Sequence, residues 1–229
     1  MIFLTKKAFR TGAFVAGLGT PFMINAQVLV HQEPIHRPVF QNQHIRILNV
    51  LLPAGDTTQY HIHHTPSVFI YFSNTTVISQ LKDSAPSTSR SVAGNIIFEN
   101  LAAPNLQIHK VFNIDSVFLH VMDVELLIKD SGFTSPPLAD PVWTLLIDTS
   151  WVRAYKAELK PNDRLALKNG SKSLLLISLS NVTVQITDHR KRQVQTLAKG
   201  AFFSIAKGQI FSLKNIHHYP ARFALLEMP

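Results

Sequence analysis

Short runs of apolar, β-branched and aromatic residues recur along the chain, and each run is bounded by Pro, Gly, Asn, Asp or Ser. Clear examples are Ile45 to Leu52, Val68 to Phe72, Leu174 to Leu179 and Phe223 to Leu226. Runs of this kind are typical of β-strands, and their regular punctuation is typical of a sandwich or a barrel. We find no long stretch with the period of an amphipathic helix. The pattern therefore predicts an all-β protein.

The same order of strands and turns occurs twice. Arg46 in VFQNQHIRILNV falls on Arg153 in LIDTSWVRAYKA when the chain is shifted by 107 positions. Further segments align in the same order, at shifts that fall to 102: those that begin at Phe72 and Leu179, at Gly94 and Gly200, and at Asn113 and Asn215. Shifts that change so little indicate one fold used twice, with small loop deletions in the second copy.

The two copies meet in a stretch of prolines and small polar residues, DSGFTSPPLADP, which is typical of a linker. We therefore predict a first domain over residues 27–130, a linker over 131–142 and a second domain over 143–229.

Residues 1–26 have a basic start, an apolar middle and small residues before a cleavage position after Ala26. This order is typical of a secretory signal peptide, and the apolar part is too short and too interrupted by Gly and Pro to span a membrane stably. The alternative is a buried N-terminal helix. We predict export by a cleavable leader, and hence a periplasmic or secreted protein.

Composition narrows the class of partner. The formal charge is +8, but without Lys6, Lys7 and Arg10 of the leader it is about +5. The remaining basic residues are scattered apart from the run at 189–192, which we interpret as a solvated hairpin turn, with a phosphate-binding patch as the alternative. We therefore expect no nucleic-acid partner, and no membrane partner once the leader is removed. The chain has no cysteine, which excludes both a disulfide framework and a lipoprotein anchor.

Histidines gather in the stretch GDTTQYHIHHTPSVFIYF, which begins at Gly55. Residues two apart on a strand point to the same face, so His61 and His63 should project together while His64 points away. The cluster is either a metal site or the polar end of a strand.

Elements of the first copy resemble the two motifs of the cupin superfamily. Gly55 is followed after five residues by His61-Ile-His63, and later come Pro104 and then His109 with Asn113 four positions on. Two copies in one chain make the protein similar to the bicupins. The resemblance implies two tandem jelly-roll β-barrels, with the ligand motif confined to the first.

The resemblance also implies that His61, His63 and His109 face into the first barrel and bind one divalent transition metal ion, with iron the first choice and Ni, Zn, Cu or Mn the others. The alternative is that the histidine pair is a polar strand end and His109 a core histidine. The family's glutamate is missing, because Ser67 and Val68 stand where it is expected. A three-histidine set remains, as in some iron-dependent cupin dioxygenases.

Other polar residues in phase with the motif are candidates for contacts with a cofactor or a ligand. Gln59 precedes His61 by two positions and is a candidate for a fourth metal ligand or a group that holds a water. Ser67 and Tyr71 on the next predicted strand, together with Gln80 and Glu99, are weaker candidates for the wall of the pocket. Each of these residues is otherwise an ordinary barrel-lining or surface residue.

The second copy lacks this chemistry. The alignment brings Lys168 or Asn169 to the position of His61, Gly170 or Ser171 to that of His63, and Phe211 to that of His109. We expect a packed barrel with an apolar centre and a scaffold role, with homodimer formation as one form of it.

The remaining histidines receive simpler interpretations. We expect His31 and His36, beside Pro34 and Pro38, to lie on an exposed arm that could instead cross a barrel mouth or a partner subunit. His217 and His218 are expected in an exposed turn, and His120 is expected to be a packed or edge residue.

Two functions are consistent with these residues. The first is a secreted or periplasmic metal-dependent dioxygenase or isomerase that acts on a small molecule. The alternative is a non-catalytic bicupin that binds a small ligand or a metal. A fold alone does not decide between them.

Overall fold

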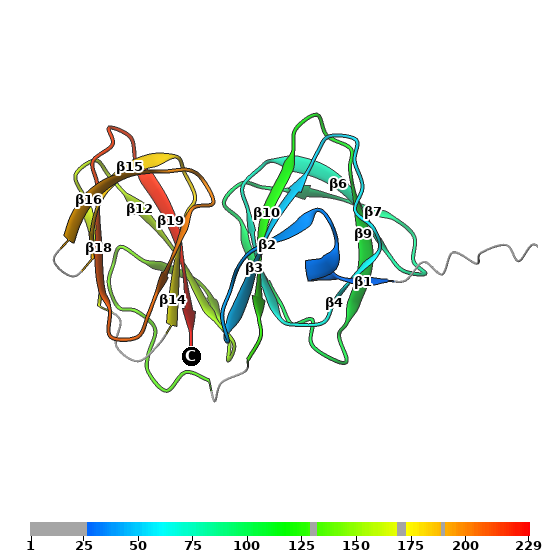
Figure 1. Ribbon diagram of the computed structural model, residues 1–229, viewed down its shortest axis with the longest axis horizontal. Coiled ribbons are helices and arrows are strands. Elements are labelled where there is room, and N and C mark those ends of the chain that lie inside the picture. Colours follow the sequence, from blue (N-terminus) through cyan, green and yellow to red (C-terminus); the bar gives the residue numbers. More distant parts are fainter. Residues whose placement is uncertain (1–26, 129–131, 169–172, 189–190) are drawn as a thin grey trace, which may run out of the picture.

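The computed structural model describes residues 27–128, 132–168, 173–188 and 191–229. The predicted leader lies outside these residues. The described chain forms two β-barrels side by side (Figure 1), and its one helical element is the short 3₁₀ helix η1 (Val30–Gln32). No helix in the described part of the chain is long and apolar enough to cross a membrane. The prediction of an all-β protein with two tandem jelly-roll barrels is confirmed.

Each sheet of the first barrel contains five strands. One sheet has the order β1 (Val28–Leu29), β4 (His61–His63), β9 (Gln107–Asn113), β6 (Thr75–Leu81) and β7 (Ser87–Ser91). The other has the order β2 (His36–Gln41), β3 (Ile45–Leu52), β10 (Leu119–Leu126), β5 (Ser67–Tyr71) and β8 (Ile96–Glu99).

The second barrel repeats this arrangement. Its five-stranded sheet has the order β11 (Thr144–Asp148), β12 (Arg153–Leu159), β19 (Ala221–Met228), β14 (Ser173–Ser178) and β17 (Phe202–Ile205). Its four-stranded sheet has the order β13 (Arg164–Lys168), β18 (Ile210–Asn215), β15 (Val182–Asp188) and β16 (Lys191–Leu197). Strand for strand, the second barrel matches the first except that, among the described residues, β1 has no counterpart.

The repeat extends to individual hydrogen bonds. Asn113 Nδ2 donates to the carbonyls of Leu52 and Val117, at 3.0 and 2.8 Å. Asn215 Nδ2 donates to the carbonyls of Leu159 and Tyr219 at the same two distances. The motif asparagine therefore holds a turn in both barrels, whether or not histidines accompany it.

The two barrels share a core. The five-stranded sheets of β3 and of β12 pack face to face through buried apolar residues, which include Ile70, Val124, Leu175 and Leu226. Strand β10 is consequently buried on nearly its whole length, because one of its faces lines the first barrel and the other faces the second barrel.

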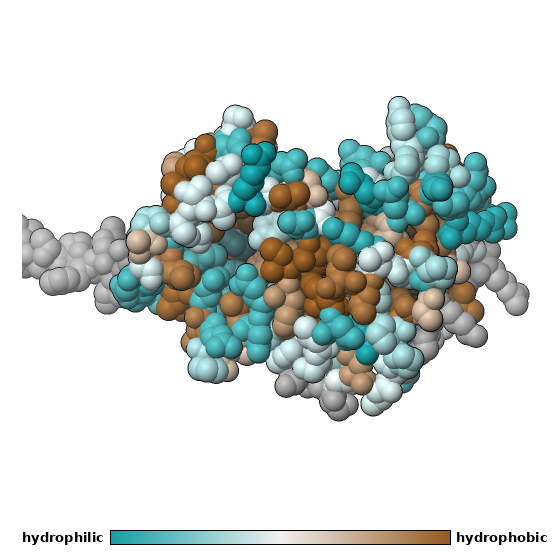
Figure 2. Space-filling model, turned by 180° about the vertical axis from the view of Figure 1, so that it is seen from behind, coloured by the Kyte–Doolittle hydropathy of each residue, from teal (hydrophilic) through white to brown (hydrophobic). Residues whose placement is uncertain are grey.

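Figure 2 shows apolar surface across the middle of one face of the molecule, where the barrels meet. The edge strands β8 and β11 contact one another, and Ile97, Leu145 and Leu146 on them are exposed. The stretch predicted as a linker packs on the second barrel, since the carbonyl of Ser135 accepts from Arg153 Nη1 at 2.9 Å.

Candidate metal centre

Strand β4 directs two histidines into the first barrel. His61 and His63 are buried, at 0% and 2% exposure, while Ile62 between them is half-buried. The alternation follows from the pleat of the strand, which sends every second side chain to the same face.

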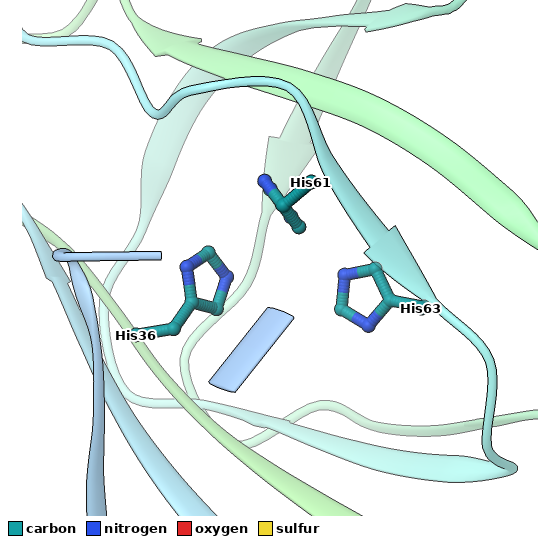
Figure 3. Close-up of side chains that lie close together, drawn as sticks. All are labelled: His36, His61 and His63. Atoms are coloured by element: carbon teal, nitrogen blue, oxygen red, sulfur yellow. The ribbon is translucent and has the colours of Figure 1, made fainter. Parts of the chain in front are cut away.

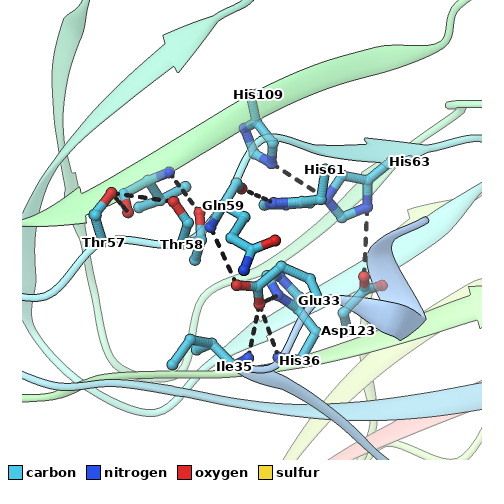
Figure 4. Close-up of polar contacts among 11 residues, drawn as sticks. Glu33, Ile35, His36, Thr57, Thr58, Gln59, His61, His63, His109 and Asp123 are labelled. Atoms are coloured by element: carbon cyan, nitrogen blue, oxygen red, sulfur yellow. Dashed lines mark hydrogen bonds and ion pairs between the residues drawn. The ribbon is translucent and has the colours of Figure 1, made fainter. Parts of the chain in front are cut away.

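Strand β9 brings the third histidine of the motif to the same place. His109 lies directly opposite His61 in the antiparallel register of β4 and β9. Its ring centroid is 4.6 Å from that of His61 and 5.1 Å from that of His63. The Nε2 atoms of His109 and His63 are 3.2 Å apart (Figure 4).

A fourth histidine, His36 at the start of β2, completes the cluster. One ring nitrogen from each of His36, His61 and His63 lies within 4.8 Å of the other two (Figure 3). His36 is only 7% exposed, and its ring centroid is 4.5 Å from that of His61. The prediction of an exposed arm at His36 was therefore wrong. Residues 28–41 instead form β1, η1 and β2 of the first barrel, and the edge strand β2 pairs with β3.

Each histidine of the cluster has one ring nitrogen beside a polar group outside the cluster. His36 Nδ1 bonds to Glu33 Oε2 at 2.7 Å, and His61 Nδ1 donates to the carbonyl of Gln59 at 2.8 Å. His109 Nδ1 lies 3.3 Å from Ser79 Oγ, and His63 Nδ1 lies 3.6 Å from Asp123 Oδ2. These partners leave the Nε2 atoms for another ligand.

Burial keeps the motif histidines neutral. Burial, reinforced by His36 and His109, lowers the pKa of His61 to about 3. Burial and the nearby His36 lower the pKa of His109 to about 4. Burial, together with His109 and His61, also holds the pKa of His63 far below its usual range. A neutral imidazole has the free lone pair that a metal ion requires.

The cluster adjoins a cavity of about 310 Å³ inside the first barrel. Its wall combines three of the histidines with polar and aromatic groups, among them His36, His63, His109, Phe69, Tyr71, Glu99 and Asp123. The cavity can hold a small organic molecule beside the histidines.

The residues present fit a bound transition metal ion. His61 Nε2 is buried without a hydrogen-bond partner, which is costly unless something else occupies its lone pair. Two imidazole nitrogens bound to one ion at about 2.1 Å lie roughly 3 Å apart, and the 3.2 Å between the Nε2 atoms of His63 and His109 matches this spacing.

Comparisons with known proteins place the fold. AerE from Microcystis aeruginosa aligns with a TM-score of 0.58 at 12% identity, over 86% of this chain and 98% of AerE. The salicylate 1,2-dioxygenase of Pseudaminobacter salicylatoxidans aligns with a TM-score of 0.57 at 10% identity, over 81% of this chain and 71% of that enzyme. The chain has the bicupin fold. No family model and no curated protein sequence matches the chain.

The other residues predicted to contact a cofactor or ligand divide into two groups. Tyr71 and Glu99 line the cavity, and Ser67 is buried on the same strand as Tyr71, with its hydroxyl unpaired. Burial, with the nearby Glu99 and Asp123, raises the pKa of Tyr71 to about 12. Tyr71 therefore keeps its phenolic proton at neutral pH.

The side chains of Gln59 and Gln80 do not line the cavity. Gln59 is exposed and contributes only main-chain groups, because β4 begins at His61 and the alternation does not extend back to residue 59. Gln80 is half-buried, and its amide points to the carbonyl of Ser84 at 3.5 Å.

The second barrel has an apolar centre, as predicted. Phe211, which corresponds to His109, is 3% exposed within a cluster of buried apolar residues. Its partner across the sheet is Leu167, so Leu167 corresponds to His61. The alignment to Lys168 or Asn169 was therefore wrong by at least one position. Residues 169–171, also named in that alignment, lie outside the described residues.

The other histidines that the structure describes do not join the cluster. His31 bonds to Arg46 Nη1 at 2.7 Å, so it too is part of the packed arm and not exposed. His120 packs against Phe72, as expected for a packed residue. His218 is exposed in its turn beside a half-buried His217, and the two rings stack.

Three residues of the site were missed from the sequence: His36, Glu33 and Asp123. One signal was available for His36. It precedes Trp143 by the same 107 positions that separate Arg46 from Arg153, and a tryptophan at the matched position favours burial. Trp143 is indeed part of the apolar core of the second barrel.

Proposed function

We propose that the first barrel binds one divalent transition metal ion through His61, His63 and His109, and that a small molecule reacts beside it in the adjoining cavity. The observation that carries the proposal is the convergence of neutral, buried imidazoles, with the Nδ1 atoms of His61 and His109 hydrogen-bonded to neighbouring groups and the Nε2 atoms of His63 and His109 3.2 Å apart. Iron is the ion we propose first, and the reaction class is dioxygenation or isomerisation.

When bound, such an ion supplies Lewis-acid polarisation and, if it is iron, electron exchange with dioxygen. The chain's own residues have other tasks. Phe69 and the apolar residues of β3 and β10 give the cavity apolar walls, and polar interactions are stronger beside such walls than in bulk water. Tyr71 offers a phenolic proton, and Glu99 offers a carboxyl group whose pKa burial raises. Both are suited to orient a polar substrate.

The protein can be tested for metal first. We expect untagged protein to contain about one equivalent of transition metal by elemental analysis, and His61→Ala or His109→Ala to reduce it to a small fraction. His218→Ala is the control, because that histidine is exposed and far along the chain from the cluster. Wild-type protein that takes up no Fe, Ni, Zn or Cu would refute the proposal.

Oxygen consumption then separates the two functions. Salicylate and gentisate are the first substrates to test, because a salicylate 1,2-dioxygenase of similar fold has been solved in complex with gentisate. Diketones, thiols and aromatic diols extend the panel. Metal-loaded protein that binds a panel compound without consuming oxygen or converting it would support the alternative, a non-catalytic bicupin that captures a small ligand.

We further propose export through the leader. The support is the order of a basic start, an apolar middle and small residues in 1–26. N-terminal sequencing of the protein from a native host should give Gln27 as the first residue. Protein that is found in the cytoplasm and still begins at Met1 would refute export.

A further inference from the structure

The N-terminal arm, defined here as residues 28–36, distinguishes the first barrel from the second. It comprises β1, η1 and the first residue of β2. Among the described residues of the second barrel, no strand corresponds to β1. At the position matched to His36 the second barrel has Trp143, which packs in an apolar core.

The arm is attached directly to the strand that carries the motif histidines. Strand β1 pairs in parallel with β4, with Val28 opposite His61 and Leu29 opposite Ile62. Glu33 strengthens this attachment, because its Oε1 accepts from the main-chain nitrogen of Gln59 at 3.2 Å. The arm therefore lies against the residues that lead into the cluster.

Glu33 also fixes the orientation of His36. Its Oε2 accepts from the main-chain nitrogens of Ile35 and His36 at 2.8 and 3.2 Å, and bonds to His36 Nδ1 at 2.7 Å. Glu33 is 2% exposed, so this carboxylate is buried against the ring that it orients. A carboxylate on Nδ1 keeps the proton on that nitrogen and makes Nε2 a stronger ligand.

The His36 ring faces the rings of His61 and His63 from the side opposite the strand that carries them (Figure 3). Its ring centroid is 4.5 Å from that of His61 and 6.1 Å from that of His63. Three nitrogens spread evenly around one ion, at metal–nitrogen bonds of about 2.1 Å, are about 3.6 Å apart. The nitrogens of His36, His61 and His63 lie within 4.8 Å of one another, so each needs to move inward by less than an ångström to share an ion.

We propose that His36 is a fourth protein ligand of the metal, and that metal binding thereby fastens the N-terminal arm to β4. His36 takes the role left open by the missing motif glutamate, so the ligand set is four imidazoles without a carboxylate. Such a set favours Fe, Ni, Cu or Zn over Mg or Ca, which prefer oxygen ligands. The inference rests on the proposed metal site.

The first test counts the ligands. X-ray absorption spectroscopy of the Zn-loaded protein should fit four imidazoles in the wild type and three in His36→Phe. Phenylalanine cannot bind the ion, and it keeps an aromatic ring at a place where the second barrel tolerates tryptophan. Three imidazoles in both proteins would overturn the proposal.

The second test measures affinity, with Zn²⁺ as the probe in a chelator competition. Loss of an orienting carboxylate costs about 10- to 100-fold in metal affinity, so we expect at least that loss in His36→Phe and a similar one in Glu33→Gln. His218→Ala should bind as the wild type does. Equal affinity in the wild type and His36→Phe, with a large loss in His61→Ala, would overturn this inference and leave the proposed metal site intact. Equal affinity in His61→Ala would instead refute the metal site itself.

The third test follows the arm directly and needs no variant to fold. Hydrogen exchange of the wild-type amides of residues 28–36 should slow by at least about tenfold when Zn²⁺ is added, because opening the arm would then require losing a ligand. Protection that appears at β4 and β9 but not in the arm would contradict the fastening.

Discussion

The two barrels of this chain share a frame, meaning the same arrangement of strands and turns, and differ in the side chains of their interiors. Matched residues keep the frame: Asn113 and Asn215 hold equivalent turns, and the cross-strand ion pair Arg46 with Glu125 recurs as Arg153 with Glu227. The interiors differ at three matched positions of the histidine cluster. His36, His61 and His109 of the first barrel correspond to Trp143, Leu167 and Phe211 of the second.

This difference shows that the frame does not depend on the interior. Turns and strand pairing use main-chain groups and a few structural side chains, so the inward positions can be apolar or polar. The second barrel is filled and can act as support, since its sheet packs against the first barrel through the shared core. The first barrel keeps a cavity and buried imidazoles, which contribute less to stability than a packed apolar centre.

The largest expected contrast lies at the matched pair Phe211 and His109. Phe211→Ala opens a hole in a packed core and should lower the free energy of unfolding by about 3–5 kcal/mol. His109→Ala borders an existing cavity and should cost about 1 kcal/mol or less in metal-free protein. Urea unfolding of both variants measures the difference. Equal costs would mean that the first barrel also depends on a tightly packed centre.

The second comparison, between the matched asparagines, should show no difference in stability cost. Asn113→Ala and Asn215→Ala each remove an amide that donates to two carbonyls, so each should cost about 2–4 kcal/mol. We expect the two costs to agree within about 1 kcal/mol in urea unfolding. A penalty confined to Asn113→Ala would instead tie the motif asparagine to the metal site.

Metal should stabilise the protein through the first barrel alone. At a free Zn²⁺ concentration 100 times the Kd, binding to the folded state adds about 2.7 kcal/mol. Thermal unfolding with and without Zn²⁺ should show this gain in the wild type and in Leu167→Ala, but not in His61→Ala. A gain that survives in His61→Ala would point to a different binding site.

The smallest predicted effect is on the pH dependence of metal-free protein. His61 binds a proton in the unfolded chain near pH 6.5 but in the folded protein only near pH 3. The unfolded state therefore holds more protons between these values, and stability falls as the pH drops below 6.5, by about 1.4 kcal/mol per pH unit for this residue. His61→Asn should reduce that slope relative to the wild type between pH 6 and 5. Parallel curves for the two proteins would contradict the depressed pKa.

Local sequence patterns were sufficient to predict much of the fold. Strand alternation predicted the all-β architecture, and the repeat of Arg46 at Arg153 and Asn113 at Asn215 predicted the duplication. The same alternation predicted that His61 and His63 face one way, because the pleat of a strand is a local property. It failed at Gln59, since the strand begins only at His61.

The rest depended on contacts between distant segments. His36 looked like part of an exposed arm beside two prolines, and no local rule indicates that β1 adds to β4 or that Glu33 turns the His36 ring toward His61. Asp123 lies in an apolar strand whose burial on both faces arises only when the two barrels pack together.

The sequence by itself determined the strands and their duplication, because alternation and repeat distance can be read along the chain, and its resemblance to the cupin motifs indicated three of the four clustered histidines. Only the tertiary structure decided that the arm closes on the cluster, which of the inward positions surround a cavity, and how the sheets share a core. Those outcomes depend on the pairing of strand edges and faces far apart in the chain, and residue spacing does not encode that pairing.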